Sequence, residues 1–236
     1  MRKRKSIAIA LIAAMTIGIA GCSERGTASE MVVTDSKGRR DTPVRDAPGT
    51  IFESYIAEYS FKEVVNKYEL IADVTIVEWL GETDEGYTFF EAKVNRVLKG
   101  EDTEKIEMIQ SGNSKATVSG FPLLKNGDRF LLFSSASNAE NKEFKGKYWI
   151  QVYTFFDIVE NEEEIYLISR YSWFDDDLVK NDNIKKITGE KRTSINETHR
   201  THDPILAQKY NDERIVFDYN DVITAILDVD RGGRGE

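Results

Sequence analysis

Residues 87–100 read YTFFEAKVNRVLKG, and this stretch decides the fold class. Apolar and polar side chains alternate along it, which is the period of a β-strand with one buried face. The set expected to face the core is Phe90, Ala92, Val94 and Leu98, and the set expected to face outward is Glu91, Lys93 and Asn95. The stretch therefore predicts a strand from Tyr87 to Leu98 that ends in a turn at Gly100.

Similar short segments lie on both sides of this strand and predict a mainly β domain. Each is rich in apolar or aromatic residues and is bounded by turn residues, as at Asn126-Gly127, where both residues tolerate a positive φ. The small and polar stretch 111–122 is expected to be a loop. Strands are expected at 73–80, 105–110, 129–133, 147–158 and 164–169. Short strands with tight turns favour a small barrel or a sandwich.

Helices are expected to flank the strands. Ser60-Phe61-Lys62-Glu63 is a capping-box pattern, and the apolar spacing after it predicts a helix that ends near Ile71. Asp218 can cap a C-terminal helix with an apolar face around Ile223. Residues 174–201 are polar and charged, so we expect loop with short helical turns there. Asp203-Pro204 is expected to open a further short helix.

Four segments of the sequence are ADVTIVEWLGE (72–82), YTFFEAKVNRVLKG (87–100), IEMIQSG (106–112) and LLKNGDRFLLF (123–133). Together they resemble a widespread set of bacterial secreted domains. The resemblance implies an OB-like barrel related to the TIMP and netrin-module fold, with a helix before it, and covers roughly residues 60–156. OB-like barrels commonly bind oligomers on one face. Metalloprotease inhibitors of this fold use a free N-terminal cysteine, and we expect no such group here.

The N-terminus predicts export of the protein and its attachment to a membrane. Arg2–Lys5 is basic, and the apolar run that follows is too short to span a bilayer, so the pair is typical of a secretory signal. Ile19–Cys22 resembles the lipobox of bacterial lipoproteins, which implies cleavage after Gly21 and acylation of Cys22 with chains such as palmitate. A lone cysteine in an exported protein fits this use, because it has no internal disulfide partner. The alternative is an ordinary signal peptide beside a chance cysteine.

Composition indicates how the rest of the chain is organised. We expect a signal peptide over 1–21, a flexible tether over 22–59, an OB-like domain with a helical C-terminal extension over 60–230, and a disordered tail over 231–236. Without residues 1–21 the chain has 28 basic and 41 acidic residues, for a net charge of −13. This acidity disfavours nucleic acid as a partner. The expected location is the extracytoplasmic side of the cell membrane, at the cell surface, held by lipid on Cys22.

Two polar clusters are candidate metal sites. His199 and His202 lie three residues apart near Glu197 and Asp203, and two imidazoles with a carboxylate can hold a metal ion. Asp175, Asp176 and Asp177, with Asp182, could hold Ca²⁺ through carboxylate oxygens, although the spacing is not that of an EF-hand. For both clusters the alternative is a solvated polar loop.

Aromatic residues are dense between 148 and 174, and Trp149, Tyr153 and Trp173 are candidate ligand-binding residues. Aromatic faces stack on sugar rings and peptide groups. The alternative is that these rings are core residues or cross-strand pairs.

The motifs favour a binding module over an enzyme. The sequence has no G-x-S-x-G elbow and no glycine-rich phosphate loop, and we expect neither a catalytic residue nor a cofactor. The expected partners are membrane lipid and an envelope protein or wall polymer. Two alternatives are open: a carboxylate-dependent hydrolase of cell-wall polymer, because 41 acids always allow a suitable pair, and a metal-binding sensor or structural protein.

Overall fold

The computed structural model describes residues 49–51, 59–118, 121–161, 164–169, 172, 174–199 and 214–233. The chain divides into two units, 1–30 and 31–236, and all of these residues belong to the second. The predicted signal peptide, Cys22 and most of the predicted tether therefore lie outside the part of the chain that is described. So do Tyr171, Trp173, His202 and the short helix expected at Asp203-Pro204.

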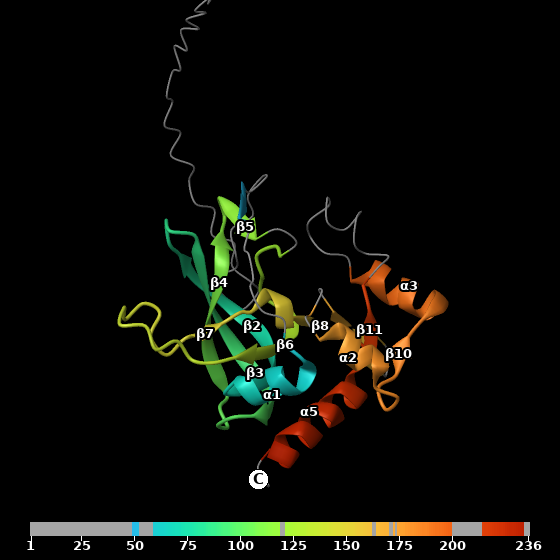
Figure 1. Cartoon of the computed structure of the whole chain (residues 1–236). Helices are drawn as coiled ribbons and strands as arrows, with labels where there is room; N and C mark the ends of the chain where they lie inside the picture. Colours follow the sequence, from blue (N-terminus) through green and yellow to red (C-terminus); the bar gives the residue numbers. More distant parts are fainter. Residues whose placement is uncertain are drawn as a thin grey trace, which may run out of the picture. The chain divides into compact units, whose positions relative to one another are not determined.

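The second unit is mainly β, as the strand pattern predicts (Figure 1). Its strands form one sheet in the order β1-β5-β4-β3-β2-β6-β8-β9-β11-β10, with β7 paired to β4. The pairs are antiparallel except β1 with β5 and β4 with β7. The strands are β1 Gly49–Ile51, β2 Leu70–Glu82, β3 Tyr87–Lys99, β4 Lys105–Asn113, β5 Ala116–Val118, β6 Arg129–Ser134, β7 Tyr148–Trp149, β8 Phe156–Asn161, β9 Glu164–Ser169, β10 Lys186–Ile187 and β11 Val216–Asp218.

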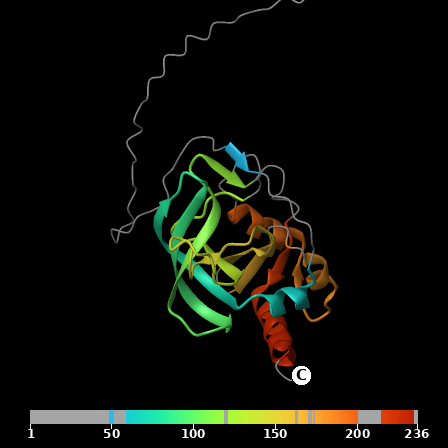
Figure 2. The same ribbon diagram turned by 60° about the vertical axis from the view of Figure 1, so that its left-hand side comes forward.

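Apolar side chains pack on both faces of this sheet. One face carries the largest apolar cluster, which joins β2, β6, β8, β9 and β11 to three helices, α1 Phe61–Lys67, α2 Asp175–Lys180 and α5 Tyr219–Gly233. The opposite face carries a second cluster on β2, β3, β4 and β6, and a third on β8, β9 and β11 against α3 Gly189–Thr198. Figure 2 gives a second view of α5 and α1 on their shared side of the sheet. The sheet therefore separates two packed layers.

The strand quoted first follows its predicted alternation for most of its length. Phe90, Ala92 and Val94 are buried in the second cluster, while Lys93 and Asn95 are exposed. Leu98 was expected on the same face, but it packs in the first cluster instead. The pairing of β3 with β2 shifts register between Asp73 and Val74 and between Ile71 and Ala72. Because such bulges change which face the following side chains occupy, the alternation inverts before Leu98.

The first helix begins as predicted and ends earlier than predicted. Both hydrogen bonds of the Ser60–Glu63 capping box are present. The helix ends at Lys67 instead of near Ile71, because β2 begins at Leu70 and pairs with β6 from that residue on. Lys99 Nζ donates to the carbonyl of Val65 at 2.7 Å, so a cation from β3 satisfies the last turn of α1.

The stretch expected to be one strand over 147–158 is broken into β7, a 3₁₀ turn over Val152–Thr154, and β8. The break lets neighbouring rings enter different layers. Phe155 packs in the second cluster and Phe156 in the first. A continuous strand would also keep the chain beside β4, whereas β8 has to reach β6.

Three further segments are more regular than predicted. Residues 174–199, expected to be loop with short helical turns, form the helices α2 and α3 and the strand β10. The loop expected over 111–122 contains the end of β4 and all of β5. Asp218 Oδ1 accepts from the Asn220 amide at 2.9 Å and caps α5 as predicted, and α5 continues to Gly233, into the expected tail. None of the helices over the described ranges is both long and apolar enough to cross a membrane.

The turn after β3 yields a stability prediction. Gly100 has φ +109°, and a Cβ at this position would lie 2.7 Å from the carbonyl oxygen of Glu69. Gly127 also has a positive φ, +91°, but has open space around it. Gly127→Ala should therefore lower the free energy of unfolding by about 1–2 kcal/mol, the cost of a left-handed alanine. Gly100→Ala should lower it further, because backbone must also move; urea unfolding of both variants measures the difference, and equal losses would contradict the close approach.

Candidate functional site

The first candidate metal residue, His199, lies just after α3 and faces a buried carboxylate. Its Nε2 is 3.5 Å from Oδ1 of Asp157 on β8, whose side chain is only 4% exposed. The backbone carbonyl of His199 accepts a hydrogen bond from the buried guanidinium of Arg214 at 2.7 Å. Since Arg214 also reaches the carbonyl of Asn196, it satisfies the C-terminal end of α3. Neither Arg214 nor Asp157 stands in a motif from which a site would be predicted.

The three aspartates at the start of α2 have three different partners. Asp175 Oδ2 accepts a hydrogen bond from Ser169 Oγ at 2.6 Å. Asp177 Oδ2 accepts from the Phe61 amide at 2.8 Å, and so joins α2 to the first turn of α1. Asp176 is exposed and lies 3.7 Å from Lys180. The carboxylates therefore diverge, and only Asp177 joins two helices.

The strand register keeps the two candidate clusters apart. Phe156 pairs with Ser169 and Asp157 with Ile168, so Asp157 and Ser169 project from opposite faces of the sheet. His199 follows Asp157 to one face, and Asp175 follows Ser169 to the other. Within the described ranges, no group of three or more His, Cys, Asp and Glu residues could hold a metal ion.

Burial has a marked effect on Asp175. Loss of water around its carboxylate raises the pKa to about 6, and the hydrogen bonds from Ser169 and the backbone only partly oppose this. In the unfolded chain the same group has its ordinary pKa of 3.8. The folded protein therefore holds a proton that the unfolded chain releases between about pH 4 and pH 6, and its stability falls as the pH rises through that window.

Asp175→Asn should remove this loss. At about pH 7.5 the variant should be more stable than the wild type by up to about 3 kcal/mol, because a raised pKa of about two units corresponds to that free energy. Near pH 4 the two proteins should differ little. Urea unfolding at both pH values measures the effect, with Asp176→Asn as the exposed control. A variant that is less stable at both pH values would mean that the ionised carboxylate is favourable where it lies.

The aromatic candidates divide between core and surface. Tyr148, Trp149 and Tyr153 are half-buried. Trp173 lies outside the described residues. For the other rings the core interpretation is confirmed, since they are at most 1% exposed; they are Phe155, Phe156, Tyr166 and Phe174.

Trp149 belongs to a group of rings on the outer face of β3, β4 and β7. We call Tyr87, Phe89, Phe144 and Trp149 the outer aromatic cluster. Tyr87 and Phe89 lie on β3, on the face opposite Phe90, and Trp149 lies on β7 beside β4. Phe144 comes from the segment between β6 and β7, and its ring centroid lies 5.3 Å from that of Tyr87 and 6.0 Å from that of Trp149. None of the four belongs to the three apolar clusters of the core.

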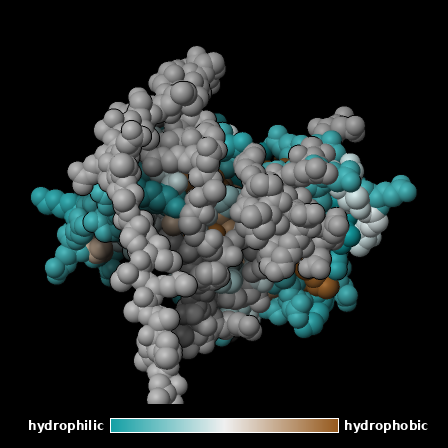
Figure 3. Space-filling view, turned by 90° about the horizontal axis from the view of Figure 1, so that it is seen from above, coloured by the Kyte–Doolittle hydropathy of each residue, from teal (hydrophilic) through white to brown (hydrophobic). Residues whose placement is uncertain are grey.

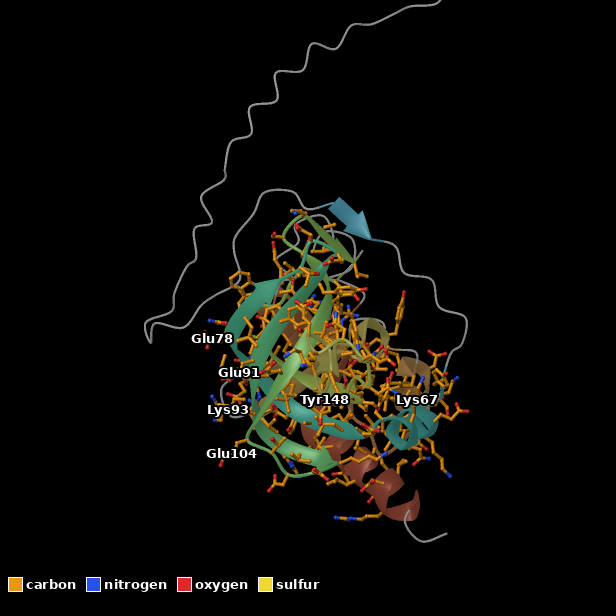
Figure 4. The ribbon with its side chains drawn as sticks, turned by 90° about the vertical axis from the view of Figure 1, so that its left-hand side faces the viewer. Lys67, Glu78, Glu91, Lys93, Glu104 and Tyr148 are labelled. Carbon is orange, nitrogen blue, oxygen red and sulfur yellow. The ribbon has the colours of Figure 1, made fainter. Side chains whose placement is uncertain are left out.

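Charged side chains continue the same outer face beyond the rings. Glu91 pairs across strands with Glu107, and each like charge is relieved by a lysine: Lys105 lies 2.7 Å from Glu91, and Lys147 binds Glu107. In Figure 4 the labelled side chains of Glu91 and Lys93 point outward from the strands. The outer face of the β3–β4 hairpin therefore has an aromatic end and a charged end.

A buried ion pair lies on the helix side of the sheet, and the sequence analysis missed it. Asp73 on β2 is 1% exposed and receives Arg129 Nη2 at 2.6 Å and Arg129 Nε at 2.9 Å. Asn95 and Tyr219 donate to the same carboxylate, each at 2.9 Å. The Asp73 carboxylate raises the pKa of Arg129, and burial with Asp73 nearby raises the pKa of Tyr219 to about 12. The sequence holds one sign of this ion pair: Asp73 is a charged residue at the start of a predicted strand that is apolar on both faces.

Comparison with known proteins adds no family. No family model matches this chain, and no curated protein matches it significantly in sequence. Its function is therefore inferred from its own residues and their contacts.

Proposed function

We propose that this chain is a lipid-anchored, extracytoplasmic binding module built on an OB-like barrel of the TIMP and netrin type. The observation that carries the proposal is the outer aromatic cluster, because three of its rings, Tyr87, Phe144 and Trp149, are only half-buried and none of the four belongs to the core clusters. The fold, the anchor and the binding surface each have separate support.

The order of strand pairing supports the OB-like barrel. β2 pairs with β3, β3 with β4, and β4 with β7. Tyr148 of β7 then bridges to Ala136, which follows β6, and β6 pairs with β2 again. Through this single bridge the order of the five strands approaches that of the partly open, five-stranded Greek-key barrel. The apolar cluster inside this path includes Phe90, Met108, Phe130 and Ile150.

The anchor is supported by the first 22 residues of the sequence. The basic start, the short apolar run and the Ile19–Cys22 quartet together favour acylation at Cys22. Mostly hydrophilic residues cover the described part of the surface in Figure 3, which suits a domain that works in water beside a membrane. The net acidity of the chain makes an envelope protein or a wall polymer a better partner than nucleic acid.

The position of the aromatic cluster supports a binding role for this face. In OB-like barrels, ligands lie across the second and third strands and the adjoining loops. Here these correspond to β3, β4 and the segment between β6 and β7, which carry Tyr87, Phe89 and Phe144. Aromatic side chains are enriched at binding surfaces because they offer large contact area with little loss of conformational freedom.

The anchor can be tested by metabolic labelling with palmitate. The wild-type chain should incorporate label and yield an N-terminal peptide that begins at Cys22 with acyl groups attached. Cys22→Ala should incorporate none, because it lacks the acceptor sulfur, while Ser23→Ala should label as the wild type does. A wild-type protein with an unmodified Cys22 thiol would contradict the anchor.

The binding surface can be tested by crosslinking in intact cells followed by pull-down. The wild-type chain should capture a specific envelope protein or wall fragment, and Trp149→Ala should capture far less, because truncating a central aromatic residue of an interface costs about 2 kcal/mol or more. Tyr153→Ala is the matched control, since it removes another half-buried ring. Equal capture by the Trp149 variant, or loss only with the Tyr153 variant, would place the binding surface elsewhere.

A further inference from the structure

Phe144 occupies the centre of the outer aromatic cluster. Its ring is nearly parallel to that of Trp149, with an angle of 6° between planes, and it meets Tyr87 edge to face at 82°. The centroid of Phe89 is 5.7 Å away. Tyr87 and Trp149 also contact one another, at 5.6 Å. Three rings from β3 and β7 therefore form a cage around the ring of Phe144.

The segment that carries Phe144 has few other ties to the barrel. Residues 138–146 are exposed except Ala139 and Phe144. The backbone hydrogen bonds found for this segment run within it or to Ser137 and Lys147 at its base, as from the Phe144 amide to the Asn141 carbonyl at 3.1 Å. The segment is thus a self-contained polar turn that inserts one ring into the cage.

We propose that the cage of Tyr87, Phe89 and Trp149 takes an aromatic side chain from a partner polypeptide, and that Phe144 is an internal occupant that must leave first. This inference rests on the proposed binding function and names the partner chemistry for the same face. The bound ring is that of a phenylalanine on a charged peptide turn, so the geometry already fits an aromatic residue in such a context. The neighbouring charges suit a polypeptide with charged flanks, because Glu107 pairs with Lys147 and Glu91 with Lys105.

The physical reason for two occupants is that the cage would otherwise expose three rings to water. Phe144 covers them from within the same chain, and its polar turn moves without breaking a strand pair, since it lies between Ala136 and Tyr148. An aromatic ring of the partner then competes with the ring of Phe144. The apparent Kd of the partner equals its intrinsic Kd divided by the fraction of time that the cage is free. Residues 138–146 thereby limit binding to partners with enough affinity to displace Phe144.

The test uses the acylated chain in detergent micelles and a synthetic peptide with the sequence of residues 141–147, NKEFKGK. Phe144→Ala should bind this peptide with a Kd of about 0.1 mM, because a tethered segment has an effective concentration of about 1 mM and fills the cage nine-tenths of the time only if the Kd is about ninefold lower. The wild type should bind it about tenfold more weakly if its own ring fills the cage nine-tenths of the time. Fluorine NMR of 5-fluorotryptophan reports binding at Trp149, with the resonance assigned by Trp149→Phe.

Two controls make the result specific. A peptide with alanine in place of phenylalanine should leave the Trp149 resonance of the Phe144→Ala chain unmoved, and the double variant Phe144→Ala with Tyr87→Ala should lose the peptide. If Phe144→Ala melts before it can be measured, Phe144→Leu replaces it and should bind the peptide more tightly than the wild type does.

Peptide binding by Phe144→Ala that is no tighter than that of the wild type would overturn the cage. Binding of the alanine peptide as well would also overturn it, because the ring would then not be what is recognised. Failure of the cage leaves the proposed module standing if Trp149→Ala still loses its cellular partner. A cage that binds the peptide while the wild-type chain captures nothing in cells would reject the binding module alone.

Discussion

The buried ion pair between Asp73 and Arg129 is the constraint on which the rest of the domain depends. A carboxylate that is 1% exposed is tolerated only when its charge and lone pairs are satisfied. The groups that satisfy Asp73 come from β3, β6 and α5 through Asn95, Arg129 and Tyr219. The register of three strands and the start of the last helix must therefore agree at one point, and removal of one partner from such a buried pair typically costs 3–5 kcal/mol.

The helix face of the sheet is covered in one part and open in another. The helix face holds the ion pair and the largest apolar cluster, and α1, α2 and α5 cover it. Further along β3 on this same face, outward residues such as Lys93 and Asn95 are exposed, while the residues between them fill the second cluster on the opposite face. The outer face of β3 and β4 is thus held in shape by packing behind it, which is what a binding surface on a rigid strand pair requires.

The candidate metal clusters show the limit of reasoning from neighbours in the sequence. Asp175, Asp176 and Asp177 are consecutive, yet each contacts a different element. The carboxylate nearest to His199 is that of Asp157 on β8, 42 residues earlier in the chain. The strands β8 and β9 lie between the two clusters, and consecutive side chains of a strand project from opposite faces of the sheet.

The sequence by itself determined the local features of this protein. The alternation from Phe90 to Asn95, the capping box at Ser60 and the cap at Asp218 depend on residues only a few positions apart, so their patterns could be recognised directly. The inversion before Leu98, the break at Val152–Thr154 and the pairing of Asp73 with Arg129 and Tyr219 were decided by tertiary structure. These features depend on bulges and on pairing with strands that are distant along the chain, so the pattern within one segment does not determine them.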